Sequence, residues 1–421
     1  MRPRRLRRAR GAAVLWLGAL LALWGALAAP APAAAQAAPG SALSVSLLTF
    51  GPGEIYWERF GHNAIRIRDA ASGSDVAYNY GIFDFGEDDF LLNFARGRMQ
   101  YRIAADATAE DLALYAQEGR WIVEQALALT PAQRQALRDY LEWNLRPENA
   151  RYRYDYFTAN CSTRVRDALD RALGGALHAQ LVAPSSGFTY RMHADRLMRP
   201  DLALMLGIDV GLGPLADRRL SFWDESFVPM LLMQRLREVR VPAADGTPVP
   251  LVQHETLLAS PRLAEPADFP PDLRWPCGAL GLGLAALLLA LARRRGRAAA
   301  RGAFAFMALS TALLCGLGGL VLAALWGLTE HTSAWRNANL LLLDPLCLLL
   351  LPAWWRARRA DWRPSRTTLR LAQAIALLAA AALCLRVLPW FVQDNRPWIA
   401  LLLPLHFALL LALRRIDARP G

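Results

Sequence analysis

The chain has 421 residues, 54% of them hydrophobic, and a formal net charge of +12. This length allows two domains or more, and the composition is too apolar and too unevenly distributed for one soluble globular domain. A positive charge of this size can indicate nucleic-acid binding, but the arginines cluster beside apolar segments near the C-terminus. The charge is therefore typical of membrane topology, and we predict no nucleic-acid partner.

The first 37 residues have the three regions of a secretory signal peptide. Arginines crowd the first ten positions, an apolar run follows over 11–29, and small residues with Ala-X-Ala patterns continue to Ala37. Cleavage after this segment is one interpretation and an uncleaved anchor is the alternative. Either interpretation predicts that the following part of the chain is exported.

Residues 38–265 have the pattern of an exported α+β domain with a small antiparallel sheet. Alternating or β-rich runs predict strands, at 44–50, 61–68, 76–83, 98–104 and 121–129. Apolar periodicity and capping residues predict helices, at 106–119, 131–145 and 160–173. Beyond residue 185 the pattern is mixed and predicts no clear order of elements.

A proline-rich linker over 266–276 leads into a predicted transmembrane domain over 277–413. Five apolar stretches lie within or at the edge of this domain, at 275–292, 302–328, 338–355, 371–391 and 398–413. Each is near the ~20 residues that cross a bilayer. Arginine clusters alternate with arginine-poor loops, which predicts an outer location for the domain before Cys277 and a cytoplasmic tail over 414–421.

Cys161 differs from the other cysteines because it alone lies in the exported domain, where it has no disulfide partner. It begins a predicted amphipathic helix, where unpaired backbone N–H groups favour the thiolate. His62 opens the second predicted strand. A thiol and an imidazole can form a nucleophile and base, although a buried packing cysteine and a structural histidine are the alternatives at this point.

Three motifs resemble the periplasmic domain of Lnb-type proteins: Phe-Gly-His-Asn-Ala-Ile at 60–65, Tyr-Asn-Tyr-Gly-Ile-Phe-Asp-Phe at 78–85, and Asn-Cys-Ser-Thr at 160–163. The apolar part is similar to the membrane domain of the same family. The resemblance implies a circularly permuted, papain-like (NlpC-like) fold followed by an all-α five-helix bundle. It also implies transfer of an acyl chain from the diacylglyceryl group of a lipoprotein to an amine, with Cys161 as nucleophile and His62 as base.

Several further residues are candidates for the site. Those expected to support the catalytic pair are Asn160, Asn63, Tyr80 and Asn79. Those expected to contact the membrane face are His331, Asn337, Asn339, Asp344 and Arg386. Ionisable groups within spans usually pair or line a polar cavity, so we further expect Asp344 and Arg386 to pair in a polar floor below Cys161.

The sequence thus predicts a membrane-bound thiol acyltransferase of the bacterial inner membrane, with its catalytic domain on the periplasmic side. Its expected partners are membrane lipids and a lipoprotein or phospholipid substrate. The alternatives are an NlpC-like cell-wall peptidase or amidase anchored by the bundle, and a non-catalytic envelope assembly protein. No cofactor is expected, and no metal, because no second histidine or cysteine stands at ligand spacing from His62 or Cys161.

Overall fold

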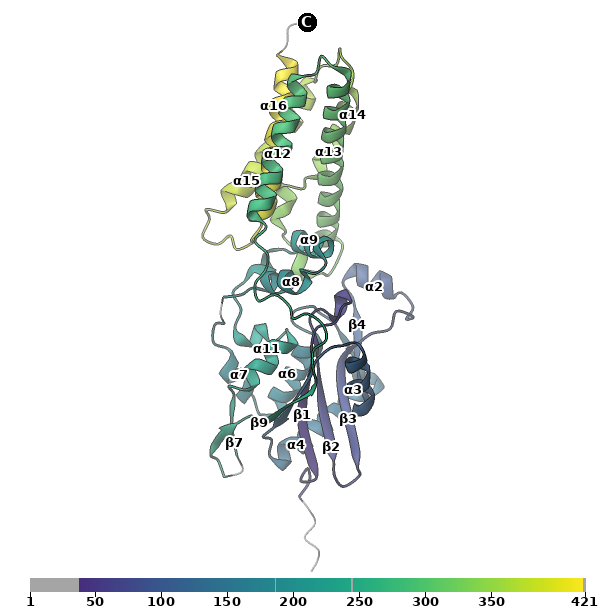
Figure 1. Cartoon of the computed structure of the whole chain (residues 1–421), viewed down its shortest axis with the longest axis vertical. Coiled ribbons are helices and arrows are strands. Elements are labelled where there is room, and N and C mark those ends of the chain that lie inside the picture. Colours follow the sequence, from purple (N-terminus) through teal and green to yellow (C-terminus); the bar gives the residue numbers. More distant parts are fainter. Residues whose placement is uncertain (1–37, 186, 244, 419–421) are drawn as a thin grey trace, which may run out of the picture.

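The structure is a computed structural model that describes residues 38–185, 187–243 and 245–418. It consists of an α+β domain and a helical bundle arranged end to end (Figure 1). The predicted signal peptide lies outside the described residues.

The α+β domain is built on a seven-stranded antiparallel sheet with the strand order β6-β4-β3-β2-β1-β5-β9. Its strands are β1 (Leu43–Phe50), β2 (His62–Asp69), β3 (Ser74–Ile82), β4 (Gln100–Ala107), β5 (Ile122–Leu127), β6 (Arg151–Arg153) and β9 (Val252–Ala259). The predicted strands correspond to β1–β5. A separate hairpin pairs β7 (Arg240–Pro242) with β8 (Pro248–Pro250).

Alternation along the strands gives the sheet two apolar faces. Ile65 of β2 and Tyr80 of β3 lie on the face covered by α6 (Cys161–Ala172), which packs through Val165. Ala64 and Phe50 lie on the opposite face, against α3 (Thr108–Gln117). Because the period of a strand is two, neighbouring residues of β2 serve the two different cores. The sheet therefore separates α3 from α6, and both helices approach the end of the sheet where β2 begins.

The predicted helices correspond to α3, α4 (Pro131–Leu145) and α6. Thr130 caps α4, because its hydroxyl accepts the backbone N–H of Gln133 at 3.3 Å, and Pro131 occupies the first turn. The remaining short helices of the domain are η1 (Tyr56–Glu58), α2 (Phe90–Arg96), α5 (Pro147–Ala150), α7 (Ala176–Leu181), α8 (Tyr190–Met198), α9 (Leu202–Gly211), η2 (Pro214–Asp217), α10 (Phe222–Glu225) and α11 (Pro229–Leu236).

The bundle contains five segments that are long and apolar enough to cross a membrane, as predicted. They are α12 (Arg274–Arg293), α13 (Ala298–Gly327), the broken segment 338–356, α15 (Arg366–Leu385) and α16 (Arg396–Asp417). The broken segment joins η4 (Ala338–Leu341), η5 (Pro345–Leu350) and α14 (Leu351–Arg356). Pro345 cannot donate a backbone hydrogen bond, which accounts for the break at this point.

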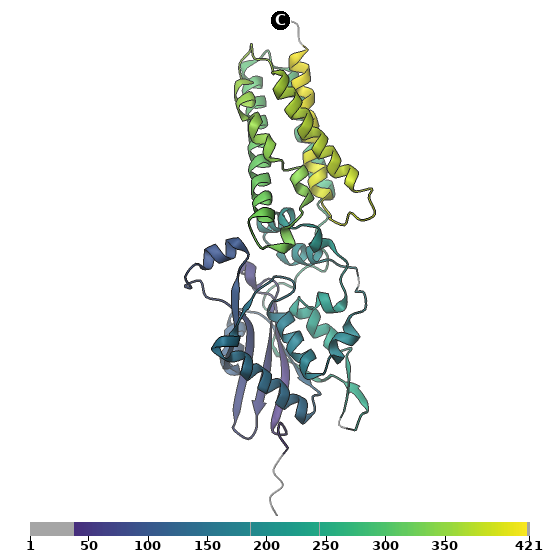
Figure 2. The same cartoon turned by 180° about the vertical axis from the view of Figure 1, so that it is seen from behind.

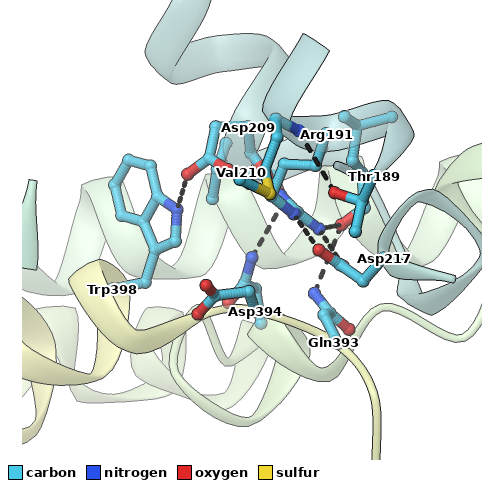
Figure 3. A network of polar contacts seen from close by, with 12 residues as sticks. Thr189, Arg191, Asp209, Val210, Asp217, Gln393, Asp394 and Trp398 are labelled. Carbon is cyan, nitrogen blue, oxygen red and sulfur yellow. Dashed lines mark hydrogen bonds and ion pairs between the residues drawn. The ribbon is translucent and has the colours of Figure 1, made fainter. Parts of the chain in front are cut away.

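Helices α8 and α9 lie between the sheet and the bundle (Figures 1 and 2). Arg191 of α8, with a side chain only 4% exposed, binds Asp209 Oδ1 at 2.7 Å and Asp217 Oδ1 at 2.8 Å. Trp398 of α16 donates its indole N–H to Asp209 Oδ2 at 2.7 Å, so one carboxylate joins α9 to the bundle (Figure 3). A buried ionic contact that is fully hydrogen-bonded fixes the orientation of the parts it joins.

Candidate active site

Cys161 is the first residue of α6, and the cap of that helix fixes its position. Asn160 Oδ1 accepts the backbone N–H of Thr163 at 2.9 Å, and Thr163 Oγ1 accepts the backbone N–H of Asn160 at 2.8 Å. The Asn160 amide also donates to the carbonyl oxygen of Phe227 at 2.9 Å. Asn160 is therefore the N-cap of α6, as the sequence predicts, and it ties the start of this helix to the segment before α11.

Asn63 fastens the same helix to the sheet. Its side-chain amide donates to Thr49 Oγ1 at 2.8 Å, and its Oδ1 lies 2.9 Å from the hydroxyl of Ser162, which donates to it. All three side chains are buried. The backbone N–H groups of Asn63 and Ser162 both point at the Cys161 sulfur. The expected supporting role of Asn63 is thus structural, and its backbone reaches the thiol.

His62 is held by a chain of hydrogen bonds across β2, β3 and α3. Its Nε2 lies 3.0 Å from Asn79 Oδ1, and Asn79 Nδ2 donates to Asp111 Oδ2 at 2.7 Å. An ionised carboxylate only accepts hydrogen bonds, so the Asn79 amide must turn its oxygen toward the imidazole. His62 then carries its proton on Nε2, and Nδ1 is the free basic nitrogen.

Two aromatic rings fix the plane of the imidazole. Phe50 and Tyr115 each stack on His62 with ring centroids 5.9 Å away. Burial is the largest cause that raises the pKa of Tyr115, and the charge of a Cys161 thiolate adds to this rise. Tyr115 therefore also lies near Cys161. Tyr115 therefore borders both candidate catalytic side chains.

His62 and Cys161 come together at one end of the sheet. His62 directly precedes Asn63, whose backbone N–H points at the Cys161 sulfur, and the Arg120 guanidinium lowers the pKa of both candidate groups. Within the described residues, no hydrogen bond joins the imidazole to the thiol. The resting site thus holds the two groups as neighbours without a direct contact between them.

Burial keeps both groups neutral. It lowers the pKa of His62 to about 4 and raises the pKa of Cys161 to about 11. The backbone N–H groups at the start of α6 do lower the thiol pKa, as the sequence predicts, but the cost of burying a thiolate outweighs them. The sequence does not reveal this cost, because burial depends on how α6 packs against the rest of the fold.

Tyr80 does not contribute to the position of His62. Its hydroxyl donates to Asn144 Oδ1 at 2.7 Å, on the sheet face that α6 covers. Asn79, the neighbour on the other face, is the residue that binds the imidazole. The sequence placed both on the correct strand, and only the register of β3 against β2 distinguishes them.

The candidate membrane-face residues lie in the junction between the two parts of the molecule. His331 Nε2 lies 2.9 Å from the carbonyl oxygen of Phe94 in α2. Asn337 and Asn339 donate to the carbonyl oxygen of Val210, at 2.8 Å and 3.0 Å, and both are buried. These two asparagines therefore hold the end of α9 and present no surface to lipid.

Asp344 and Arg386 do not form the expected pair. Asp344 is buried and caps η5, accepting the backbone N–H of Leu346 at 2.9 Å. Arg386 follows α15 and donates to the carbonyl oxygen of Gln393. The prediction was wrong because Asp344 accepts a backbone N–H at the start of η5, whereas Arg386 binds the loop that follows α15.

Several residues of the site could not be identified from the sequence. Asp111 and Tyr115 belong to a helix with no recognisable motif, and Gly81 is visible only as part of the Tyr-Gly-Ile-Phe motif. No group of three or more His, Cys, Asp or Glu side chains that could hold a metal ion occurs in the part of the chain that the structure describes.

The fold and the site define a membrane protein whose extracytoplasmic α+β domain holds a half-buried cysteine, a half-buried histidine and a buried asparagine at one end of its sheet. The Lnb N-terminal periplasmic domain matches residues 31–196, and the Lnb transmembrane domain matches residues 277–415. The chain therefore belongs to the Lnb-type family. No curated protein and no solved structure matches it.

Proposed function

We propose that this protein is a thiol acyltransferase of the bacterial inner membrane, with its catalytic domain in the periplasm. It moves an acyl chain from a lipid ester, in the diacylglyceryl group of a lipoprotein or in a phospholipid, to an amine. The observation that carries the proposal is the hydrogen-bonded chain Asp111–Asn79–His62, which orients an imidazole beside Cys161 in a domain joined to a membrane bundle. A base that is itself oriented by a third group is the usual arrangement for an activated nucleophile.

The arrangement also supports a permuted papain-like fold. A cysteine at a helix N-terminus packs against an antiparallel sheet, and the histidine and asparagine come from two neighbouring strands. The strands precede the cysteine helix in the chain, as the permuted order requires.

In the first half of the reaction, His62 Nδ1 removes the proton of Cys161 as the sulfur attacks the ester carbonyl carbon. The backbone N–H groups of Asn63 and Ser162, which point at the sulfur in the resting site, stabilise the oxyanion. The tetrahedral intermediate then collapses and breaks the ester C–O bond. His62 gives its proton to the departing alkoxide, so the products are a thioester on Cys161 and a free hydroxyl on the glyceryl group.

In the second half, an amine attacks the thioester carbonyl. His62 accepts a proton from the attacking nitrogen and returns it to the leaving sulfur, which restores the neutral thiol and releases an amide. The neutral resting pair suits this chemistry, because His62 is a base in each half. Asn79 keeps the proton of Nε2 in place while Nδ1 exchanges protons.

The test uses the full chain in detergent with a synthetic diacylated lipopeptide that has a free N-terminal cysteine amine. Intact-mass analysis should find one acyl chain on Cys161, removable by hydroxylamine, and the lipopeptide should acquire a hydroxylamine-resistant N-acyl group. Cys161→Ala and His62→Ala should each abolish both signals, and the double variant should be no worse than either, since the groups act as a unit. Cys384→Ala, at an exposed position in α15, is the matched cysteine control.

An untouched lipopeptide together with cleavage of cell-wall peptides would contradict acyl transfer and support the peptidase alternative. Activity of Cys161→Ala close to that of the unaltered protein would exclude the thiol mechanism.

A further inference from the structure

Exposed apolar side chains gather at the bundle end of the α+β domain. Trp57 of η1, Phe85 after β3, and Leu91, Leu92 and Phe94 of α2 have exposed fractions between 41% and 75%. We call these five residues the apolar rim. Helix α2 projects sideways from the domain at this end, as both views show (Figures 1 and 2). Exposed apolar residues that lie singly need no explanation, but a contiguous group marks an interaction surface.

The apolar rim is held next to the end of a membrane-spanning helix, α13. Helix α13 ends at Gly327, and Glu330, three residues later, donates its backbone N–H to the carbonyl oxygen of Arg96 at 2.8 Å. Next to it, His331 Nε2 lies 2.9 Å from the carbonyl oxygen of Phe94. Two backbone carbonyls of α2 are thus bound by the loop that directly follows a membrane-spanning helix.

Further contacts make this attachment rigid. The Glu330 carboxylate binds Arg98 Nε at 2.7 Å and also pairs with Arg153. Gly97 has a φ of +72°, and a Cβ there would lie 2.6 Å from the backbone nitrogen of His331. The loop therefore packs directly against the end of α2 with no space for a side chain between them, and the hydrogen bonds of Glu330 and His331 oppose their separation. The height of the rim relative to the bilayer is therefore fixed by α13.

Aromatic rings connect the rim to the candidate nucleophile. Trp57 meets Phe85 with ring centroids 5.7 Å apart, and Phe85 meets Phe83 at 5.0 Å. Phe83 then meets Tyr101 at 5.0 Å, and Tyr101 stacks on Tyr154 at 4.1 Å. Tyr154 lies near Cys161, because the charge of a Cys161 thiolate is the second cause, after burial, that raises the pKa of this tyrosine.

We propose that the apolar rim enters the outer leaflet of the membrane and binds the acyl chains of the lipid whose ester reaches Cys161. The occupant is lipid because the rim is continuous with the bundle through Glu330 and His331. Tryptophan and phenylalanine suit the boundary between headgroups and acyl chains, and Leu91 and Phe94 share one side of α2. The proposed membrane contact does not depend on the proposed acyl transfer. The proposed delivery of the ester to Cys161 does depend on that function.

The membrane contact is tested by photo-crosslinking. A benzophenone amino acid replaces Leu91, or replaces Leu114 as the control, a leucine on α3 with an exposed fraction of 53%. The full chain is irradiated in its native membranes and in vesicles of phosphatidylethanolamine and phosphatidylglycerol. We expect a lipid-sized mass increase at position 91 in both settings, well above that at position 114. Equal labelling at the two positions, or a protein adduct at position 91 in native membranes, overturns the proposal.

The delivery of the ester is tested by comparing two substrates. Leu91→Gln with Leu92→Gln should reduce turnover of a vesicle-borne ester about tenfold more than turnover of a soluble butyrate ester, because two apolar side chains no longer enter the leaflet. Leu114→Gln should not change this ratio. An unchanged ratio in the rim variant overturns the delivery role. Lipid crosslinking without any turnover of either ester by the unaltered protein would instead refute the proposed function and leave the membrane contact intact.

Discussion

Gly81 of β3 faces Cys161 so closely that a Cβ at Gly81 would lie 3.2 Å from the Cβ of the cysteine. Gly81 also has a φ of +89°, in the left-handed region that side chains disfavour. The sheet and α6 therefore meet at a residue without a side chain, and this absence allows the thiol of Cys161 to lie against β3.

Gly81→Ala should displace Cys161 and lower the rate of acyl-enzyme formation at least tenfold. Gly73→Ala is the matched control, since Gly73 has a φ of +76° and nothing within 4 Å of an added Cβ. Both variants should lose about 1–2 kcal/mol of unfolding free energy through backbone strain. Thermal unfolding measures the shared loss, and intact mass measures acylation. Equal acylation by the two variants would show that the contact with Cys161 is unimportant.

The hydrogen-bonded chain from His62 through Asn79 to Asp111 leads to a prediction about the pH dependence of activity. The double variant Asn79→Asp, Asp111→Asn conserves the total charge but brings the carboxylate next to the imidazole. A neighbouring carboxylate favours imidazolium, so the pKa of His62 should rise from about 4. Because the base must be neutral, activity is lost as pH falls through this pKa. We expect the acid limb of kcat/KM to move up by about one to three pH units, and an unmoved limb would exclude His62 as the base.

The Cys161 thiol, which is half-buried and neutral, should react slowly with a small alkylating agent. With a pKa of about 11, Cys161 is about one part in ten thousand thiolate at pH 7. The rate with iodoacetamide should rise about tenfold per pH unit up to that pKa. Mass mapping of the Cys161 peptide separates this site from the other cysteines. A rate that levels off below pH 7 would indicate a resting thiolate and contradict the neutral pair.

Loss of the Arg191 side chain should weaken the junction between the domain and the bundle. Arg191→Met leaves Asp209 and Asp217 as buried carboxylates without their cation, at a cost of about 3–5 kcal/mol. Arg218→Met is the control, since the ion pair of Arg218 with Asp224 is half-exposed and worth at most about 1 kcal/mol. Thermal unfolding in detergent compares the two. A similar loss in both variants would show that the buried network contributes little.

The sequence predicts best those features that depend on local pattern. The alternation in β2 and β3, the Thr130 and Asn160 caps and the five apolar spans each depend on neighbouring residues, and each agrees with the structure. Strand β9 was not predicted because this segment forms a strand by pairing with β5, which lies more than a hundred residues earlier in the chain.

Only part of the site was predicted, because some of its residues come together only through long-range packing. Cys161 and His62 belong to recognisable motifs, whereas Asp111 reaches Asn79 only after the sheet and α3 have packed. Depth in the membrane suggested that Asp344 and Arg386 should pair, but depth does not determine the direction in which a side chain points. Burial, which sets the pKa values of His62 and Cys161, is likewise a property of the whole fold.

The bond from Trp398 to Asp209 and the asparagines that hold Val210 have a consequence for substrate selection. These contacts fix the α+β domain relative to the membrane-spanning helices. Cys161 is therefore held at one distance from the membrane surface. Under the proposed function, the site would accept an ester according to how far its carbonyl lies from the bilayer centre, while the methyl end of its acyl chain remains among the other lipid tails. If the proposed acyl transfer holds, the rate should depend on the position of the ester carbonyl and only weakly on the length of the acyl chain.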